Sequence, residues 1–163
     1  ATGVAESSMT FSGIKFVIDS GYELFGYYDP DKDAKVLERK FISQSQAIQR
    51  MGRAGRIEPG ICYHLYTEED FKNKMDKYPE PNIRTTNIYQ ECLKLLSNHQ
   101  INTIKNLINV LSEFIEAPKE KYIKSAIQQL QQLKLLDNEK ITEFGKIIAE
   151  LQMDPKMGVA IYN

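Results

Sequence analysis

The sequence is poor in several features, and each scarcity excludes a class of protein. It has 163 residues, and no stretch approaches the roughly eighteen apolar residues that a membrane-spanning helix needs. Two cysteines, Cys62 and Cys92, are too few and too far apart for a disulfide framework or a zinc site. We interpret them as core thiols of an intracellular, reducing compartment. Because 42% of the residues are hydrophobic, wholesale disorder is excluded as well.

The N-terminus has neither an initiator methionine nor the basic and apolar segments of a signal peptide. We therefore expect it to be a cut end. The C-terminus is expected to be cut too, because residues 153–163 begin an element that they are too short to complete.

Arginine is scarce but concentrated. The net charge of −1 does not indicate a nucleic-acid partner, yet three of the five arginines, Arg50, Arg53 and Arg56, fall within seven residues. The lysines, in contrast, are spread along the chain. Because a guanidinium group binds phosphate or carboxylate with two N–H groups, the cluster indicates a local binding task.

Glycine marks a boundary, since seven of the nine glycines lie in residues 1–60. We place the boundary in the proline-containing stretch 77–82. Before it, β-branched and aromatic residues predict a buried strand over residues 14–19 and a further strand over 60–66. After it, the chain is predicted to be mainly helical.

A β-hairpin is predicted at about residues 21–41, because two strand-like segments flank the turn-rich hexapeptide 29–34. The hairpin carries four aromatic side chains: Tyr22, Phe25, Tyr27 and Tyr28. Two interpretations stay open for these rings. They pack against the body of the domain, or they form a wedge or stacking surface for nucleic-acid bases.

A short helix is predicted to begin at Ser43 or Ser45, either of which can cap it, and to run into the arginine cluster. At 100° per residue, three polar side chains would share a stripe about 60° wide: Gln49, Arg53 and Arg56. Arg50 would point about 100° away from Gln49.

Two glycines, Gly52 and Gly55, lie beside this stripe and would let another surface approach the backbone closely. Each glycine costs about 1 kcal/mol relative to alanine inside a helix. Because an ordinary solvated turn would gain nothing that offsets this cost, we interpret the cluster as a binding site.

Apolar residues after the boundary recur at helical spacing. They predict helices over about 86–97, 101–118 and 119–134, an apolar ribbon over 135–141, and a helix capped by Thr142. This order predicts a winged-helix module. Its third helix is rich in glutamine rather than lysine or arginine, which favours a structural or docking role over reading of duplex DNA. No metal site is expected, since His64 has no partner at ligand spacing.

The arginine cluster also carries a family resemblance. Residues 49–56, QRMGRAGR, resemble motif VI of the superfamily 2 helicases with the spacing of the DEAH-box branch, QRxGRxGR. Residues 1–10 resemble motif V of that branch, ATNxAETSxT, and residues 59–68 resemble its PGxCYRLYT stretch. Residues 141–145 and 151–155 resemble the end of its winged helix and the entry to its ratchet-like domain. The resemblance covers essentially the whole chain.

The resemblance implies an α/β segment followed by a mainly α segment. Residues 1–78 would form the distal part of a second RecA-like lobe of the P-loop NTPase type, with the hairpin at about 21–41. Residues 79–152 would form a winged-helix domain, and residues 153–163 would begin a truncated ratchet-like domain.

The first RecA-like lobe is absent from this sequence, which has no GxxxxGK(S/T) phosphate loop and no DExH motif. Phosphoryl transfer needs a phosphate cradle, a Mg²⁺ site and a charge-stabilising arginine. The resemblance therefore implies ATP and Mg²⁺ for the intact protein, with Mg²⁺ held by the missing lobe. We expect this fragment to bind neither and to be inactive alone.

The resemblance implies a role for each residue that matches motif VI. Gln49, Arg53 and Arg56 would face the terminal phosphate and the attacking water, with the two arginines as arginine fingers. Gly52 would lie at the nucleotide. Arg50 would form an internal or interdomain ion pair.

Motif V implies further contacts. Ser8 would sense the nucleotide state, Thr10 and Ser12 would contact its sugar, and Thr2 and Gly3 would contact the RNA backbone. Two departures from the family pattern weaken these contacts. Gly3 replaces an asparagine, which leaves a backbone N–H for a phosphate, and Ser12 replaces an aspartate, which makes its ribose contact neutral.

The implied function is that of an ATP-dependent RNA helicase, which couples ATP hydrolysis to translocation on single-stranded RNA and to unwinding. Its contacts would go to the RNA backbone and carry little sequence preference. Two alternatives stay open: a non-catalytic protein-docking or nucleic-acid-binding module, and a DNA helicase of the same superfamily. An activating protein partner is compatible with the helicase function, and no membrane partner is expected.

Overall fold

The computed structural model describes residues 13–55 and 58–162. The chain forms two compact units, the first from residues 1–26 and 37–80 and the second from 27–36 and 81–163. Six candidate site residues lie outside the described residues: Thr2, Gly3, Ser8, Thr10, Ser12 and Arg56.

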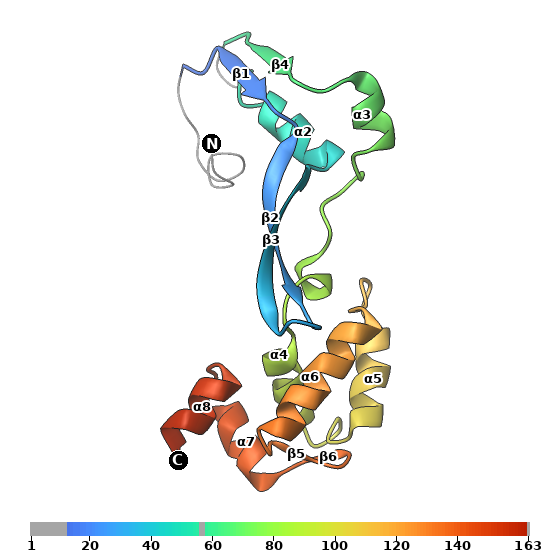
Figure 1. Ribbon diagram of the computed structural model, residues 1–163, viewed down its shortest axis with the longest axis vertical. Coiled ribbons are helices and arrows are strands. Elements are labelled where there is room, and N and C mark those ends of the chain that lie inside the picture. The colour runs from blue at the N-terminus through green and yellow to red at the C-terminus, as the bar shows by residue number, and fades with distance from the viewer. Residues whose placement is uncertain (1–12, 56–57, 163) are drawn as a thin grey trace. The chain divides into compact units, whose positions relative to one another are not determined.

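The first unit contains a two-stranded parallel sheet with helices beside it (Figure 1). These elements are β1 (Phe16–Asp19), β4 (Ile61–His64), α2 (Gln44–Met51) and α3 (Glu68–Asn73). β1 pairs with β4 so that Phe16 lies opposite Ile61. α2 packs against β1, and a small core forms around the buried side chains of Ile42, Ala47 and Met75.

β1 differs from the buried strand that the sequence predicts. Phe16 and Ile18 are 63% and 71% exposed, and Ile61 and Tyr63 of β4 are exposed opposite them. Asp19, at the end of the strand, is buried instead. The physical reason is that the sheet has two strands in the described part of the chain, and α2 leaves the face with Phe16 and Ile18 uncovered.

The predicted hairpin is formed by β2 (Tyr22–Asp29) and β3 (Ala34–Phe41). Its loop, residues 30–33, is longer than a two-residue turn and ends with Asp33 at a φ of 46°. Tyr22 stacks on Phe41 in the first unit, with 4.4 Å between the ring centroids. The outer end of the hairpin, residues 27–36, is part of the second unit.

The phenol of Tyr28 lies at the centre of a polar network in the second unit. It donates to Asp33 Oδ1 at 2.8 Å and accepts from Gln129 Nε2 at 2.6 Å. Asn87 Nδ2 donates to Gln129 Oε1 at 3.1 Å, and the Tyr122 hydroxyl donates to the carbonyl of Tyr28 at 2.9 Å. Tyr28 is therefore a buried ring that packs into the protein, as the first interpretation of the hairpin aromatics states.

The second unit is mainly helical. Its elements are η1 (Asn82–Arg84), α4 (Tyr89–Leu96), α5 (Ile104–Ser112), α6 (Glu120–Gln132), β5 (Leu136–Asp137), β6 (Lys140–Ile141), α7 (Glu143–Glu150) and α8 (Pro155–Tyr162). Three helices, a two-stranded ribbon and a fourth helix occur in the predicted order, while the winged-helix name stays a prediction. Thr142 caps α7 as predicted, because its Oγ1 accepts from the Gly145 N–H at 2.9 Å. None of the described helices combines the length and apolar character that crossing a membrane requires.

One core holds this second unit together. The buried side chains that α4, α5 and α6 contribute to it are Tyr89, Cys92, Leu93, Leu96, Leu107, Leu111, Tyr122, Ala126 and Leu130. Tyr28 of the hairpin belongs to the same cluster. Burial raises the pKa of the Cys92 thiol to about 12, so this cysteine is an inert core thiol.

Replacing Gln129 by alanine is expected to lower the free energy of unfolding of the second unit by about 1–3 kcal/mol. The change removes the donor to the Tyr28 hydroxyl and the acceptor of the Asn87 amide inside a buried site. Urea unfolding, followed by hydrogen exchange of the α6 amides, measures the loss. Gln128→Ala, exposed on the same helix, is the matched control and should stay within about 0.5 kcal/mol of the wild type. Equal losses in both variants would contradict the importance of the network.

The Asp33 carboxylate is expected to give the second unit a pH dependence. The Tyr28 hydroxyl, and after it the Lys156 ammonium at 3.1 Å, hold the pKa of Asp33 below its ordinary value of 3.8. A lowered folded-state pKa stabilises the folded unit above about pH 4, and this contribution is lost as the pH falls through the folded-state pKa. In urea unfolding at stepwise pH, Asp33→Asn should therefore lose less stability below pH 4 than the wild type. Parallel pH profiles would show that Asp33 contributes nothing.

Candidate functional site

Polar contacts fix the start of α2, the helix that leads into the arginine cluster. Of the two candidate caps, Ser43 and Ser45, it is Ser43 that caps the helix. Ser43 Oγ accepts from the Gln46 N–H at 3.3 Å, and Gln46 Oε1 accepts from the Ser43 N–H at 2.9 Å. Gln46 Nε2 also donates to Glu23 of β2 at 2.9 Å. Gln44 Nε2 donates to the carbonyl of Phe71 in α3 at 2.9 Å. The helix is therefore tied to the hairpin and to α3 before it reaches the arginines.

The helix ends earlier than the sequence predicts. α2 stops at Met51, and the next backbone N–H groups bond to carbonyls three residues back, Arg53 to Arg50 at 3.1 Å and Ala54 to Met51 at 3.2 Å. Arg53 thus lies on a tight turn, and the helical stripe that placed Gln49 and Arg53 together does not apply to it.

Glycine content explains the early end. Gly52 is the C-cap of α2, and its N–H bonds to the carbonyl of Ile48 at 2.9 Å. Gly52 and Gly55 each disfavour a helix by about 1 kcal/mol, and bonding to the third residue back tightens the last turn. The helix therefore ends at Met51, and a compact turn carries Arg53.

The candidate residues of motif VI that the structure describes lie at the end of α2 and on this loop. Gln49 is exposed on α2, Gly52 is exposed at the cap, and Arg53 is half-buried on the turn. Their contacts to a nucleotide stay predictions, as do those of Arg56 outside the described residues.

Arg50 forms the expected internal ion pair. Its Nη1 donates to Asp19 Oδ1 at 2.9 Å and to the carbonyl of Tyr22 at 3.2 Å. The side chain of Asp19 is 1% exposed, and it also accepts from the Gly21 N–H at 3.1 Å and the Tyr66 hydroxyl at 3.2 Å. Both carboxylate oxygens therefore have donors, which a buried charge requires.

Burial and the charge of Asp19 perturb two neighbours. Burial first, and the Asp19 carboxylate second, raise the pKa of Tyr66, whose hydroxyl stays protonated as a donor. The same two causes raise the pKa of the Cys62 thiol, which is therefore unsuited to act as a thiolate. His64 Nδ1 lies 3.9 Å from Cys62 Sγ, but no three His, Cys, Asp or Glu side chains in the described ranges form a group that could hold a metal ion.

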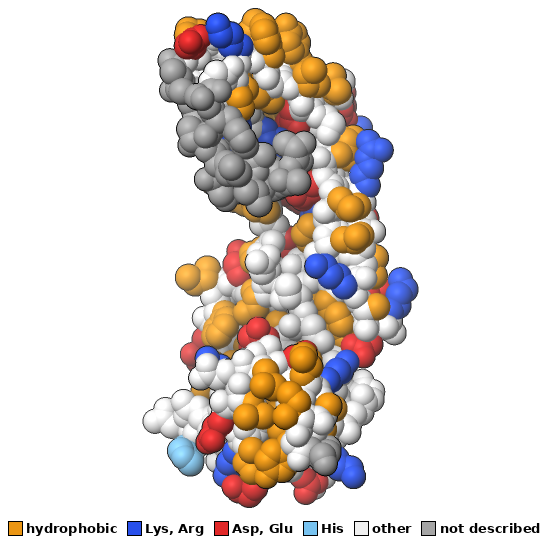
Figure 2. Space-filling view, turned by 90° about the vertical axis from the view of Figure 1, so that its left-hand side faces the viewer, with side chains coloured by type: hydrophobic (Ala, Val, Ile, Leu, Met, Phe, Trp, Pro, Cys, Tyr) orange, Lys and Arg blue, Asp and Glu red, His pale blue; other side chains and the backbone are white. Residues whose placement is uncertain are grey.

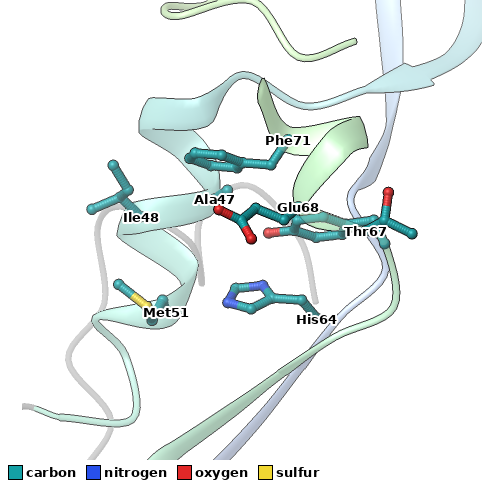
Figure 3. Close-up of a pocket in the computed structure, with 8 residues that line it drawn as sticks. Ala47, Ile48, Met51, His64, Thr67, Glu68 and Phe71 are labelled. Carbon is teal, nitrogen blue, oxygen red and sulfur yellow. The ribbon is translucent and has the colours of Figure 1, made fainter. Parts of the chain in front are cut away.

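An apolar pocket of about 280 Å³ opens beside α2 (Figure 3). The residues that line it from α2 are Ala47, Ile48 and Met51. In Figure 3, His64 and Phe71 lie across the pocket from α2, and the carboxylate of Glu68 lies between them. Neither Gln49 nor Arg53 lines this pocket, so it is separate from these two candidate residues.

Sequence reasoning missed Asp19 and Tyr66 as parts of the site. A signal for Asp19 existed, because it is the acidic residue that ends an apolar strand, and Arg50 was the arginine directed away from the stripe. Tyr66 gave no comparable signal, since its hydroxyl reaches Asp19 across 47 residues of chain.

Comparisons with known proteins bear on the whole chain. No family model matches it. The chain is 37% identical over 166 residues to the Homo sapiens ATP-dependent RNA helicase DHX33, covering 99% of this chain and 22% of that protein. It is 37% identical over 158 residues to the Schizosaccharomyces pombe pre-mRNA-splicing factor ATP-dependent RNA helicase prp22, covering 96% and 13%. A solved structure of the E. coli DExH-box NTPase HrpB is 29% identical with a TM-score of 0.83, over 98% of this chain and 19% of that one.

The resemblance to DEAH-box ATP-dependent RNA helicases is thereby confirmed along nearly the whole chain, which is homologous to a segment of these proteins. The chain spans about a fifth of the length of the relatives DHX33 and HrpB, and less of prp22.

Replacing Asp19 by asparagine is expected to destabilise the first unit by about 3 kcal/mol, because the largely buried Arg50 guanidinium loses its counter-charge. Thermal unfolding and hydrogen exchange of the α2 amides measure the effect. Asp76→Asn, an exposed aspartate of the same unit, serves as the control and should change stability by less than about 0.5 kcal/mol. An Asp19→Asn protein as stable as this control would show that the ion pair does not hold the unit together.

Proposed function

We propose that this chain is a working part of an ATP-dependent RNA helicase, which couples ATP hydrolysis to translocation on RNA and to its unwinding. The observation that carries the proposal is that the described residues of motif VI have different surroundings. Arg50 is engaged by Asp19 inside the first unit, while Gln49 is exposed and Arg53 lies on the turn beyond the helix. The homologous helicases cover nearly the whole chain, which supports the same assignment.

In this proposal, Gln49 orients the attacking water, and Arg53 and Arg56 act as arginine fingers at the terminal phosphate of ATP. Negative charge spreads over the transferred phosphoryl group, and a guanidinium group placed there is worth about 10³ to 10⁵ in rate. An exposed amide and a half-buried guanidinium at the end of one helix fit a phosphate ligand. Gly52, which has no side chain, lets the nucleotide approach the cap of α2.

The remaining contacts are proposed from motif V. Ser8, Thr10 and Ser12 contact the nucleotide, and Thr2 and Gly3 contact the RNA backbone. Mg²⁺ is held outside this chain, by a lobe that carries the phosphate loop and the acidic motif missing from the sequence. The 163-residue chain alone is accordingly proposed to be inactive.

The exposed face of β1 and β4 supports a role within a larger lobe. One face of this parallel sheet is apolar and exposed; it consists of Phe16, Ile18, Ile61 and Tyr63. Hydrophobic side chains are exposed at the top of Figure 2, the end of the molecule at which Figure 1 draws β1 and β4. Parallel sheets occur almost only where both faces are covered. We propose that other parts of the same RecA-like lobe cover this face in the intact enzyme.

A protein-docking function is the second candidate, and one observation favours it. α7 and α8 pack together and expose apolar side chains, among them Met157, Ile161 and Tyr162 (Figure 2). A cluster of this kind is typical of a surface that another protein or domain covers.

RNA is preferred over DNA as the substrate because the relatives are named RNA helicases. A reducing intracellular compartment is proposed from the two free thiols, Cys62 and Cys92.

Arg53→Ala in the full-length protein is expected to abolish RNA-stimulated ATP hydrolysis, a loss of at least about 10³-fold, and to leave RNA binding nearly intact. Steady-state ATP turnover and RNA binding by fluorescence anisotropy measure the two properties. Arg84→Ala removes an arginine whose ion pair with Glu116 lies in the second unit, and it should keep turnover within about twofold. Retained turnover in Arg53→Ala would refute the arginine-finger assignment. Turnover by neither the 163-residue chain nor the full-length protein would favour the docking function.

A further inference from the structure

We propose that Gly60 is a positioning residue for Arg53: its close contact with the backbone of Ala54 holds the turn that carries this arginine in place. The inference rests on the proposed function, because it concerns the placement of Arg53. Gly60 lies at the far end of the loop that begins at Gly52, directly before β4.

The contact is too close for any other residue. A Cβ atom at Gly60 would lie 1.9 Å from the carbonyl oxygen of Ala54, 2.6 Å from its carbonyl carbon and 2.8 Å from its methyl group. Ala54 itself is 2% exposed, so the contact is buried on the Ala54 side. Because ordinary van der Waals contact begins near 3.4 Å, a methyl group at position 60 would displace the Ala54 carbonyl by about 1.5 Å.

Space, not backbone conformation, requires this glycine. Gly13 and Gly21 are the glycines with positive φ angles in the described part of the chain, and Gly60 is not among them. A left-handed backbone conformation is therefore not what requires glycine at position 60. The requirement that the structure shows is the close approach of the Ala54 backbone.

Gly60 cannot move away to relieve such a clash, because β4 fixes it. The N–H of Ile61 donates to the carbonyl of Lys15 at 2.8 Å, and β4 then pairs with β1 along its length. At the other end of β1, Asp19 holds Arg50 and with it the end of α2. The loop is therefore anchored through β1 at both of its ends.

The displacement would reach Arg53 directly. Ala54 follows Arg53 in the chain, and its N–H holds the turn closed by bonding to the carbonyl of Met51 at 3.2 Å. A misplacement of about 1 Å at catalytic groups can lower a rate about 100-fold. Gly60 thus acts on the reaction through Arg53 without touching the nucleotide.

The test is Gly60→Ala in the full-length protein. We expect kcat for RNA-stimulated ATP hydrolysis to fall about 100-fold, while KM for ATP and RNA affinity change less than about threefold. In an Arg53→Lys background, which has lost the guanidinium fork, the same change should lower kcat less than it does in the wild type, because both act through one group. Equal fold-losses in the two backgrounds would overturn the proposal, as would wild-type turnover in Gly60→Ala.

Gly145→Ala is the matched control for a general loss of stability. A Cβ at Gly145 would lie 2.3 Å from the carbonyl oxygen of Leu135, a backbone clash of the same kind inside the second unit. We expect a lower melting temperature in Gly145→Ala and a kcat within about threefold of the wild type at a temperature where the protein is folded. If kcat falls as far in Gly145→Ala as in Gly60→Ala, loss of stability explains both and the proposal fails.

A second variant decides the question if Gly60→Ala does not fold. Ala54→Gly adds no atoms but removes the buried methyl group and loosens the loop at the contact point. It should lower kcat about tenfold at unchanged RNA affinity, and a wild-type kcat would overturn the proposal. Arg53→Ala distinguishes a failure of the role proposed for Gly60 from a failure of the arginine-finger assignment. An inactive Arg53→Ala beside a fully active Gly60→Ala refutes only the role of Gly60, whereas an active Arg53→Ala refutes the arginine fingers themselves.

Discussion

The first unit depends on the ion pair and the hydrogen bonds that the buried carboxylate of Asp19 forms. It ends β1, accepts from the backbone of Gly21 at the turn into the hairpin, and binds Arg50 and the hydroxyl of Tyr66. One side chain thus joins the sheet, the hairpin, α2 and the segment after β4. A buried carboxylate is costly unless donors surround it, so these elements are constrained to meet at one point. The position of Arg50 near the end of α2 follows from that constraint.

The second unit uses a comparable arrangement with less charge. The phenol of Tyr28 takes the place of the carboxylate, and Gln129, Asn87 and Asp33 supply the polar partners. Because Tyr28 is carried by β2, whose first residues belong to the other unit, the hairpin is shared by both units. The aromatic residues of the hairpin are therefore partly explained by packing. A wedge function would have to come from side chains other than Tyr28.

Local patterns predicted local features well. Ser43 and Thr142 cap helices because a cap needs only a hydroxyl and the N–H groups two or three residues later. The hairpin and the direction of Arg50 also followed from spacing within short segments. The exposure of β1 and the end of α2 at Met51 did not, because they depend on which elements cover a face and on how a glycine-rich loop closes. The contact of Gly60 with Ala54 likewise becomes visible only in three dimensions.

The parallel pairing of β1 with β4 also bears on when the turn that carries Arg53 forms. Phe16 and Ile61 are 45 residues apart in the chain, and every residue of the hairpin, α2 and the loop lies between them. Closing so long a segment carries an entropic cost, and such non-local pairing is slow. The contact of Gly60 with Ala54 is therefore expected to form late in folding, after β4 has been synthesised and has paired with β1. The position of the turn that carries Arg53 should then depend on the cooperative stability of the whole unit.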